Sequence, residues 1–230
     1  MINKKCIVRV LSCLMIGMMF MALSACGKTG AADNVSASNQ QQRSSNVAES
    51  GSKILIAYFT AAENSGVDAI ASASYTKING EAVGRLRAVA DMIKDQTGGD
   101  LFSIQTSNVY PADGGELINL AADEQDKKFR PELTSHIQNL GDYDVIFVGF
   151  PNWWYDMPMA MYSFFEEYDF SGKTIIPFNV HNGSRFSNTI NTIQDLEPGA
   201  TVVTNGFTVS ERDVADAQND VRKWLSDLGY

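Results

Sequence analysis

Three loop segments carry the residues of this chain whose types and spacing could do chemistry. The turn at Thr60-Ala61 joins a hydroxyl to small residues, and its backbone N–H groups could wrap a phosphate at a helix start. The run Pro151-Asn152-Trp153-Trp154 holds aromatic rings on which a flat apolar ligand could stack. The segment His181-Asn182-Gly183-Ser184 is polar and contains glycine, so it could aim backbone groups at the edge of a heterocycle. These segments are therefore the candidate functional loops.

Each loop also has a plainer interpretation. The first is equally consistent with an ordinary strand-to-helix turn, because it lacks the glycine patterns GxGxxG and GxxxxGK[ST] of dinucleotide and triphosphate loops. The aromatic loop could instead fold onto its own core or form a protein interface. His181 on its own is weak evidence for a catalytic base or a metal ligand.

Several kinds of catalytic site find no support in the sequence. Ser184 lies outside a GxSxG elbow, which argues against a hydrolase triad. His136 and His181 are the only histidines, too few for a histidine-rich metal site. All three cysteines lie within the first 26 residues, so the rest of the chain has no disulfide framework, no CxxC motif and no catalytic thiol. We expect no bound metal, and we assign no catalytic side chain.

The composition is that of an acidic globular protein. The chain has 18 Lys+Arg against 27 Asp+Glu, a net charge of −9, and 44% hydrophobic residues. This mixture excludes disorder along the whole chain and fibrous repeats. Because the negative charge would be repelled by phosphate backbones, we expect no nucleic-acid partner.

The N-terminus has the pattern of a secretory signal. Positive charges at Lys4, Lys5 and Arg9 precede a short apolar run over residues 10–23, and Ser24-Ala25-Cys26 follows. The sequence around Cys26 resembles the lipobox of bacterial lipoproteins. It implies a signal peptide over residues 1–25 and a lipidated Cys26, holding the protein outside the cytoplasmic membrane. An uncleaved anchor and ordinary secretion are the alternatives.

The segment after Cys26 has the composition of a flexible tether. Ser, Ala, Asn, Gln and Gly dominate residues 27–52, which contain hardly an aliphatic side chain to bury. Residues 26–52 are thus predicted to be the lipidated cysteine and a linker, and residues 53–230 a single folded domain.

The folded part alternates apolar runs of strand length with helical patterns. Continuous apolar runs are typical of strands that are buried on both faces of a parallel sheet. Alternation of this kind indicates an α/β doubly wound sheet, whose ligands bind at the carboxyl ends of the strands. The pattern predicts strands over 53–59, 101–106, 144–150, 174–180 and 201–207, helices over 81–96, 115–129 and 159–168, and a last helix opened by a capping box at 210–213.

Specific motifs add a resemblance to this pattern. The first loop contains Ala62-Glu63-Asn64, Pro151–Trp154 is followed by Met157-Pro158, and Asp169–Pro177 reads Asp-Phe-Ser-Gly-Lys-Thr-Ile-Ile-Pro. Over residues 53–230 the chain resembles the flavodoxin family, in the branch with an Ala/Gly-Glu-Asn first loop and an insertion before helix one. The resemblance implies a five-stranded parallel sheet of order 2-1-3-4-5 in one three-layer domain, with FMN at its carboxyl edge.

The resemblance also assigns roles to the loop residues. The tryptophans would flank or cover the flavin ring, with Trp154 favoured as the main contact. The assigned FMN-binding residues are Thr60, Ala61, Gly84, Arg85 and Leu86 at the phosphate, Pro151, Asn152, Trp153 and Trp154 at the ring, and His181, Asn182, Gly183 and Ser184 at the pyrimidine side.

The chain departs from the family pattern in both phosphate and ring loops. Leu86 stands where a hydroxyl would donate to the phosphate, although the neighbouring Arg85 could supply a charge-assisted bond. Arg185 replaces a glycine of the fourth loop, and Glu63 brings an anion close to the expected phosphate. Glu63 is tolerable there only if it points away.

Two classes of function follow from the resemblance. The first is an FMN-binding electron-transfer protein, which would exchange electrons with redox partner proteins or act as a reductase of quinones or other small acceptors. The second is a flavodoxin-fold binding or interaction lipoprotein that has lost FMN. In both, the membrane would be a partner only through the lipid anchor.

Overall fold

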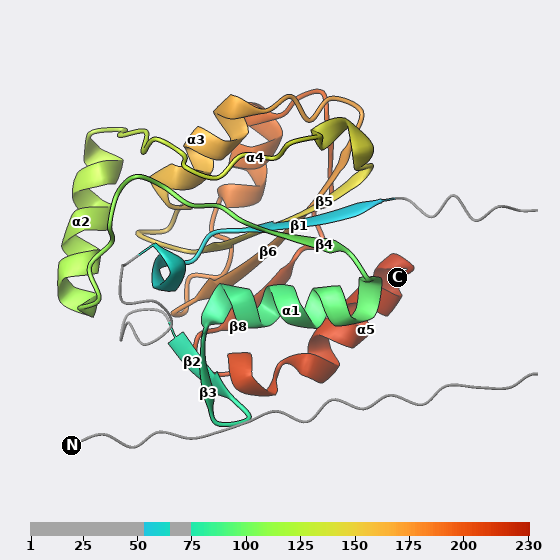
Figure 1. The fold of residues 1–230 in the computed structure, drawn as a ribbon, viewed down its shortest axis with the longest axis horizontal. Coiled ribbons are helices and arrows are strands. Elements are labelled where there is room, and N and C mark those ends of the chain that lie inside the picture. Colours follow the sequence, from blue (N-terminus) through green and yellow to red (C-terminus); the bar gives the residue numbers. More distant parts are fainter. Residues whose placement is uncertain (1–52, 65–74) are drawn as a thin grey trace, which may run out of the picture. The chain divides into compact units, whose positions relative to one another are not determined.

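The computed structural model describes residues 53–64 and 75–230, which contain a central parallel sheet (Figure 1). Its strand order is β4-β1-β5-β6-β7. The first residues of β6 pair with β7, and its last residues pair with β8 on the same edge. The doubly wound class expected from the pattern and the order 2-1-3-4-5 implied by the resemblance are confirmed. The strands are β1 (Ile54–Tyr58), β4 (Asp100–Ser103), β5 (Val145–Pro151), β6 (Thr174–His181), β7 (Thr201–Val202) and β8 (Phe207–Ser210).

The central strands β1, β5 and β6 form where the sequence is mostly apolar. Ile56 of β1 lies between Leu101 of β4 and Phe147 of β5, and Phe147 pairs in turn with Ile176 of β6. Ile56 and Phe147 are completely buried. Because both faces of these strands are covered, the polar alternation of a half-exposed strand is absent from their sequences.

Helices cover the two faces of the sheet in separate layers (Figure 1). One face packs against α1 (Arg85–Thr97) and α5 (Gln218–Leu228), with Val89 and Leu225 in its core. The other packs against α3 (Met159–Glu167) and α4 (Thr189–Leu196), with Phe164 and Ile193 in its core. Helix α2 (Gly114–Asp126) is capped by Asp113, whose side chain accepts hydrogen bonds from the N–H groups of Gly115 and Glu116. The three-layer prediction is confirmed.

The predicted helix over 81–96 is wrong at its start. Residues Glu81–Gly84 form β3, which pairs with β2 (Tyr75–Ile78) in a separate antiparallel hairpin, and the helix begins at Arg85. The hairpin turns at Asn79 and Gly80, whose φ angles are 51° and 88°. Asn-Gly favours this two-residue turn because both positions need positive φ.

The fifth strand and the last helix also differ from the prediction. Strand 201–207 is split into β7 and β8, and between them the carbonyl oxygen of Asn205 accepts a hydrogen bond from the Trp224 indole at 2.8 Å. The capping box at 210–213 is absent, because Ser210 ends β8. A short 3-10 helix, η4 (Val214–Asp216), then precedes α5. Helix α4 was not predicted, since its eight residues are mostly polar.

The predictions for the signal peptide over 1–25, the lipidated Cys26 and the linker to residue 52 lie outside the described residues. Within the described ranges, none of the helices has both the length and the apolar character that crossing a bilayer requires.

Candidate functional site

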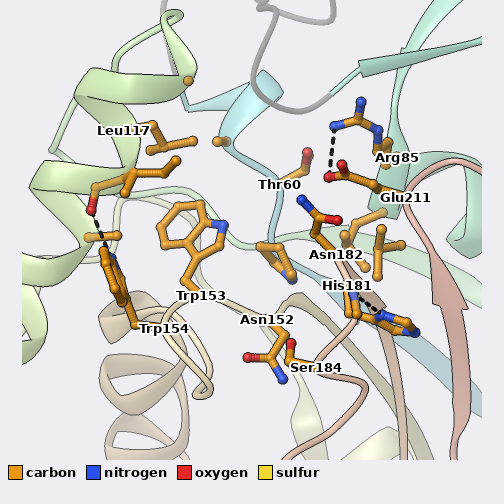
Figure 2. Close-up of a pocket in the computed structure, with 18 of the residues that line it drawn as sticks. Thr60, Arg85, Leu117, Asn152, Trp153, Trp154, His181, Asn182, Ser184 and Glu211 are labelled. Carbon is orange, nitrogen blue, oxygen red and sulfur yellow. Dashed lines mark hydrogen bonds and ion pairs between the residues drawn. The ribbon is translucent and has the colours of Figure 1, made fainter.

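A cavity of about 700 Å³ opens at the carboxyl ends of β1, β5 and β6, where a doubly wound sheet binds its ligands (Figure 2). The start of α1 and one side of α2 complete its wall. The cavity is lined by Thr60, Ala61, Arg85, Leu86, Gly114, Leu117, Ile118, Ala121, Pro151, Asn152, Trp153, Trp154, Tyr155, Val180, His181, Asn182, Gly183, Ser184 and Glu211.

One end of the cavity is formed by Thr60 and the first turn of α1. Thr60 and Ala61 are buried, and Gly84, the N-cap of α1, lies directly behind Thr60. A Cβ on Gly84 would come within 3.0 Å of the Thr60 Oγ1. In the described part of the chain, no side chain caps α1 and no acid stands in its first turn. The partial positive charge of this helix end therefore favours an anion beside Thr60.

An ion pair stands at this same end. The Arg85 guanidinium lies 3.9 Å from a carboxylate oxygen of Glu211, and both side chains line the cavity (Figure 2). Glu211 follows β8, and its backbone N–H donates to the carbonyl oxygen of His181 at 2.9 Å. This bond ties the acid to the polar loop after β6.

Trp153 forms a wall of the cavity. Its ring meets Phe59 edge to face at a centroid distance of 5.7 Å, and Tyr110 at the same distance with the planes inclined by 58°. Its backbone exchanges hydrogen bonds of 2.8 and 2.9 Å with Asp156, closing a tight turn. The ring is thus held in place before any ligand arrives.

Trp154 lies at the edge of the same turn. Its indole N–H donates to the carbonyl oxygen of Ile118 on α2 at 2.9 Å, and half of the residue is exposed. Trp154 and Tyr155 have φ angles of 49° and 64°, which are unusual for large side chains. Such conformations persist where the surrounding structure holds them, and they concentrate at functional sites.

Asn152 and the buried Asn179 both hold the loop after β6. The Asn179 side-chain amide donates to the carbonyl oxygen of Arg185 at 2.8 Å, and Asn152 donates to the same oxygen. Arg185 has a φ of 53°, the left-handed conformation that suits glycine better. Its side chain is not among the described residues that line the cavity. The side-chain oxygen of Asn152 is buried without a partner among the described residues, and Asn152 lines the cavity.

A hydrogen bond within the loop after β6 fixes the orientation of the His181 ring. The Nδ1 of His181 accepts a hydrogen bond from the N–H of Gly183 at 2.9 Å. Desolvation, and secondarily the positive charge of Arg185, lower the pKa of His181 below its usual value. The ring is therefore neutral near pH 7, as the accepting Nδ1 requires.

The Ala62-Glu63-Asn64 signature fixes the first loop from outside the cavity. The Tyr58 hydroxyl donates to Glu63 at 3.1 Å, and Arg87 lies 3.7 Å from the same carboxylate. Asn64 is buried, donating to the carbonyl oxygens of Thr60 and Ile104. Glu63 thus points away from the cavity, as phosphate binding at Thr60 would require.

Comparison with known proteins agrees with this geometry. A family model described as flavodoxin matches residues 79–228. The chain belongs to the flavodoxin family. Comparison with curated proteins finds no match.

Solved structures share the flavodoxin-family fold. A candidate flavoprotein from Bacteroides uniformis is 27% identical, with a TM-score of 0.59 over 76% of this chain and 99% of that one. A candidate flavoprotein from Bacteroides eggerthii is 25% identical, with a TM-score of 0.58 over 78% and 99%. A Lactobacillus acidophilus flavoprotein in complex with FMN is 18% identical, with a TM-score of 0.52 over 76% and 99%, a likeness of fold alone.

All the residues predicted for the cofactor site of this flavodoxin-family chain line the one cavity, except Gly84, which supports Thr60 from behind. Their contact with FMN stays a prediction. The sequence analysis missed Glu211, four residues of α2, Tyr155 and Val180. The helix over 115–129 was predicted, but nothing in the sequence shows that Leu117 and Ala121 face a cavity. Within the described ranges, His, Cys, Asp and Glu form no group of three that could hold a metal ion.

Proposed function

We propose that this flavodoxin-family protein binds FMN in the cavity and transfers electrons through it. The observation that carries the proposal is the layout of one cavity. An anion-favouring helix start and the polar loop 181–184 lie together at one end, joined through Glu211, and Trp153 and Trp154 form the opposite side (Figure 2). A phosphorylated flavin carries a charged phosphate, a polar pyrimidine edge and a flat ring face that match these three kinds of group.

Two details of the structure support the fit. Gly84 brings the helix start against Thr60, where a Cβ would crowd the Thr60 hydroxyl, so backbone N–H groups come close to where the phosphate would bind. The side-chain oxygen of Asn152, a residue of the cavity wall, is a buried acceptor without a partner among the described residues, which a ring N–H would satisfy if the side chain turned toward it. FMN is the ligand of the Lactobacillus acidophilus flavoprotein, which shares this fold.

In this proposal the protein holds and shields the cofactor, and FMN supplies the electron-transfer chemistry. Thr60 and the start of α1 hold the phosphate. Trp153 and Trp154 cover the ring and exclude water from it. The backbone of loop 181–184 binds the pyrimidine edge. The net charge of −9 raises the free energy of any further negative charge on the ring, so we expect a low midpoint potential.

We further propose that the protein works outside the cytoplasmic membrane, anchored through acyl chains on Cys26. The support is the lipobox-like sequence before Cys26 and the polar tether that follows it. More than one acyl chain is needed for stable anchoring. Redox proteins or small acceptors such as quinones would then meet the flavin on that side of the membrane.

A binding lipoprotein that has lost FMN is the second candidate. Leu86 supplies no hydroxyl to a phosphate, and Glu211 places a carboxylate in the cavity. Incubation of the purified protein with FMN, followed by reductive titration of whatever flavin stays bound, separates the two functions. An electron-transfer protein holds FMN through reduction and reoxidation, whereas a binding protein that has lost FMN does not load with it.

A further inference from the structure

The cavity wall contains one carboxylate, that of Glu211, which pairs with Arg85 beside the expected phosphate position. We propose that Glu211 sets the selectivity between phosphorylated and unphosphorylated flavins, because its carboxylate competes with the flavin phosphate for Arg85. The inference rests on the proposed function, and it assigns Glu211 and Arg85 as a specificity-determining pair.

The two residues are the charged members of the cavity wall. Of the described residues that line it, Glu211 is the only carboxylate and Arg85 the only permanent cation. Glu63, the other acid near the first loop, is turned toward Tyr58 and Arg87 and does not line the cavity. Selectivity for charge therefore depends on one pair.

The pair is held where the phosphate would bind. Arg85 is the first residue of α1, next to Gly84 and its contact with Thr60. Glu211 is anchored by its backbone bond to His181. The side chains of Arg85 and Glu211 are only 21% and 32% exposed, so water screens their interaction incompletely. This anchor fixes the backbone of Glu211 beside the phosphate end, and its side chain reaches Arg85 from there.

Charge decides the direction of the effect. A phosphate monoester carries about −1.5 to −2 charges at pH 7, and it binds an arginine more strongly than a single carboxylate does. To bind the phosphate, Arg85 must break its ion pair with Glu211 or bind both groups at once. In either case the negative charge of Glu211 remains nearby and repels the phosphate. Riboflavin lacks the phosphate and meets neither group as an anion. Glu211 thus weakens FMN binding and leaves riboflavin binding unaltered.

Affinities of the purified protein for FMN and for riboflavin, measured by flavin fluorescence at low salt, test this inference. Glu211→Gln keeps the shape of the side chain and removes its charge. We expect FMN to bind about tenfold more tightly or better, equivalent to about 1.4 kcal/mol, and riboflavin to bind as before. The gain should shrink at high salt, where charges are screened. Arg85→Gln should weaken FMN alone.

Asp216→Asn is the matched control, since it removes one exposed acid on the same segment, outside the cavity. It should change neither affinity. The inference is overturned if Glu211→Gln weakens FMN, which would mean that Glu211 pre-orders Arg85. It is overturned equally if both flavins shift alike, or if the control matches the variant. Failure of the unaltered protein to bind either flavin would overturn the proposed function itself, and this inference with it.

Discussion

The ring of Trp153 meets the ring of Phe59 edge to face, with their planes at 83°. Phe59 directly follows β1, and Trp153 follows β5, so this contact joins the two loops that would hold the two ends of a flavin. Trp153 is partly buried, packs against the core and also forms part of the cavity wall. Trp154, its neighbour, is half exposed and contacts α2 through a single hydrogen bond.

The two tryptophans should therefore respond differently to truncation. Trp153→Ala removes packing against Phe59 and Tyr110, and it should lower the stability of the apoprotein by about 3 kcal/mol. Trp154→Ala should leave the apoprotein nearly as stable and still weaken FMN about tenfold, through lost stacking and covered area. Melting curves and FMN titrations of both variants check this. Two variants that melt early but bind FMN normally would mean that the loop only packs the core.

Asn64 should matter for stability out of proportion to its size. Its side chain bonds the carbonyl oxygens of Thr60 and Ile104, and its oxygen accepts from the N–H of Thr106 at 2.9 Å. Asn64→Ala removes these three hydrogen bonds from a buried site, and the Thr60 carbonyl oxygen keeps only its bond from the Glu63 N–H, so we expect a cost of about 3 kcal/mol. Denaturant unfolding measures the loss. Asn191→Ala, on the exposed side of α4, is the control and should change little. Equal stability of the two variants would contradict this role.

The fold was predictable where a local pattern had one interpretation. The apolar run before Thr60 and the run before Pro151 have few polar residues, so a doubly buried strand was the simplest structure for each. Residues 81–84 are different, because they can extend the helical stripe of Leu86 and Val89 backward. The Asn79-Gly80 turn signal that decides for a hairpin was present in the sequence.

The candidate site was predictable only where its residues follow strands directly. Glu211 approaches Arg85 from a segment far along the chain, and its local sequence has the pattern of a helix cap. The approach depends on β8 pairing with β6, which places the Glu211 backbone against His181. Tertiary pairing of this kind leaves no signal in the residues around Glu211.

Acidification should loosen the loop at His181. Its pKa is lowered in the folded protein, mainly by desolvation, so below the usual value of 6.5 the unfolded chain takes up the proton first. The stability contributed by the neutral ring is present above pH 6.5 and is lost as the pH falls through the lowered pKa. Melting temperatures across this range should fall less in His181→Gln than in the unaltered protein. The control variant His136→Gln should show the same fall in melting temperature as the unaltered protein. An identical fall in the unaltered protein and in His181→Gln would contradict this role of His181.

Replacement of Cys26 tests the proposed location. The unaltered protein should partition with membranes and carry acyl chains on Cys26, because more than one chain holds a protein stably on a bilayer. Cys26→Ser should release the protein or leave its precursor uncut. Mass spectrometry of the N-terminal peptide measures the acylation of Cys26 and the position of cleavage, and membrane fractionation measures the partitioning. An unmodified Cys26, or cleavage well beyond it, would contradict the anchor.

Titration of the apoprotein with FMN tests the central claim most directly. Binding in the cavity should quench flavin fluorescence through the tryptophans and raise the melting temperature. At a hundred times the Kd, the ligand adds about 2.7 kcal/mol of stability, which corresponds to roughly 5–10 °C for a domain of this size. We predict saturable quenching together with this shift. Saturating FMN that produces neither quenching nor a shift would contradict the account.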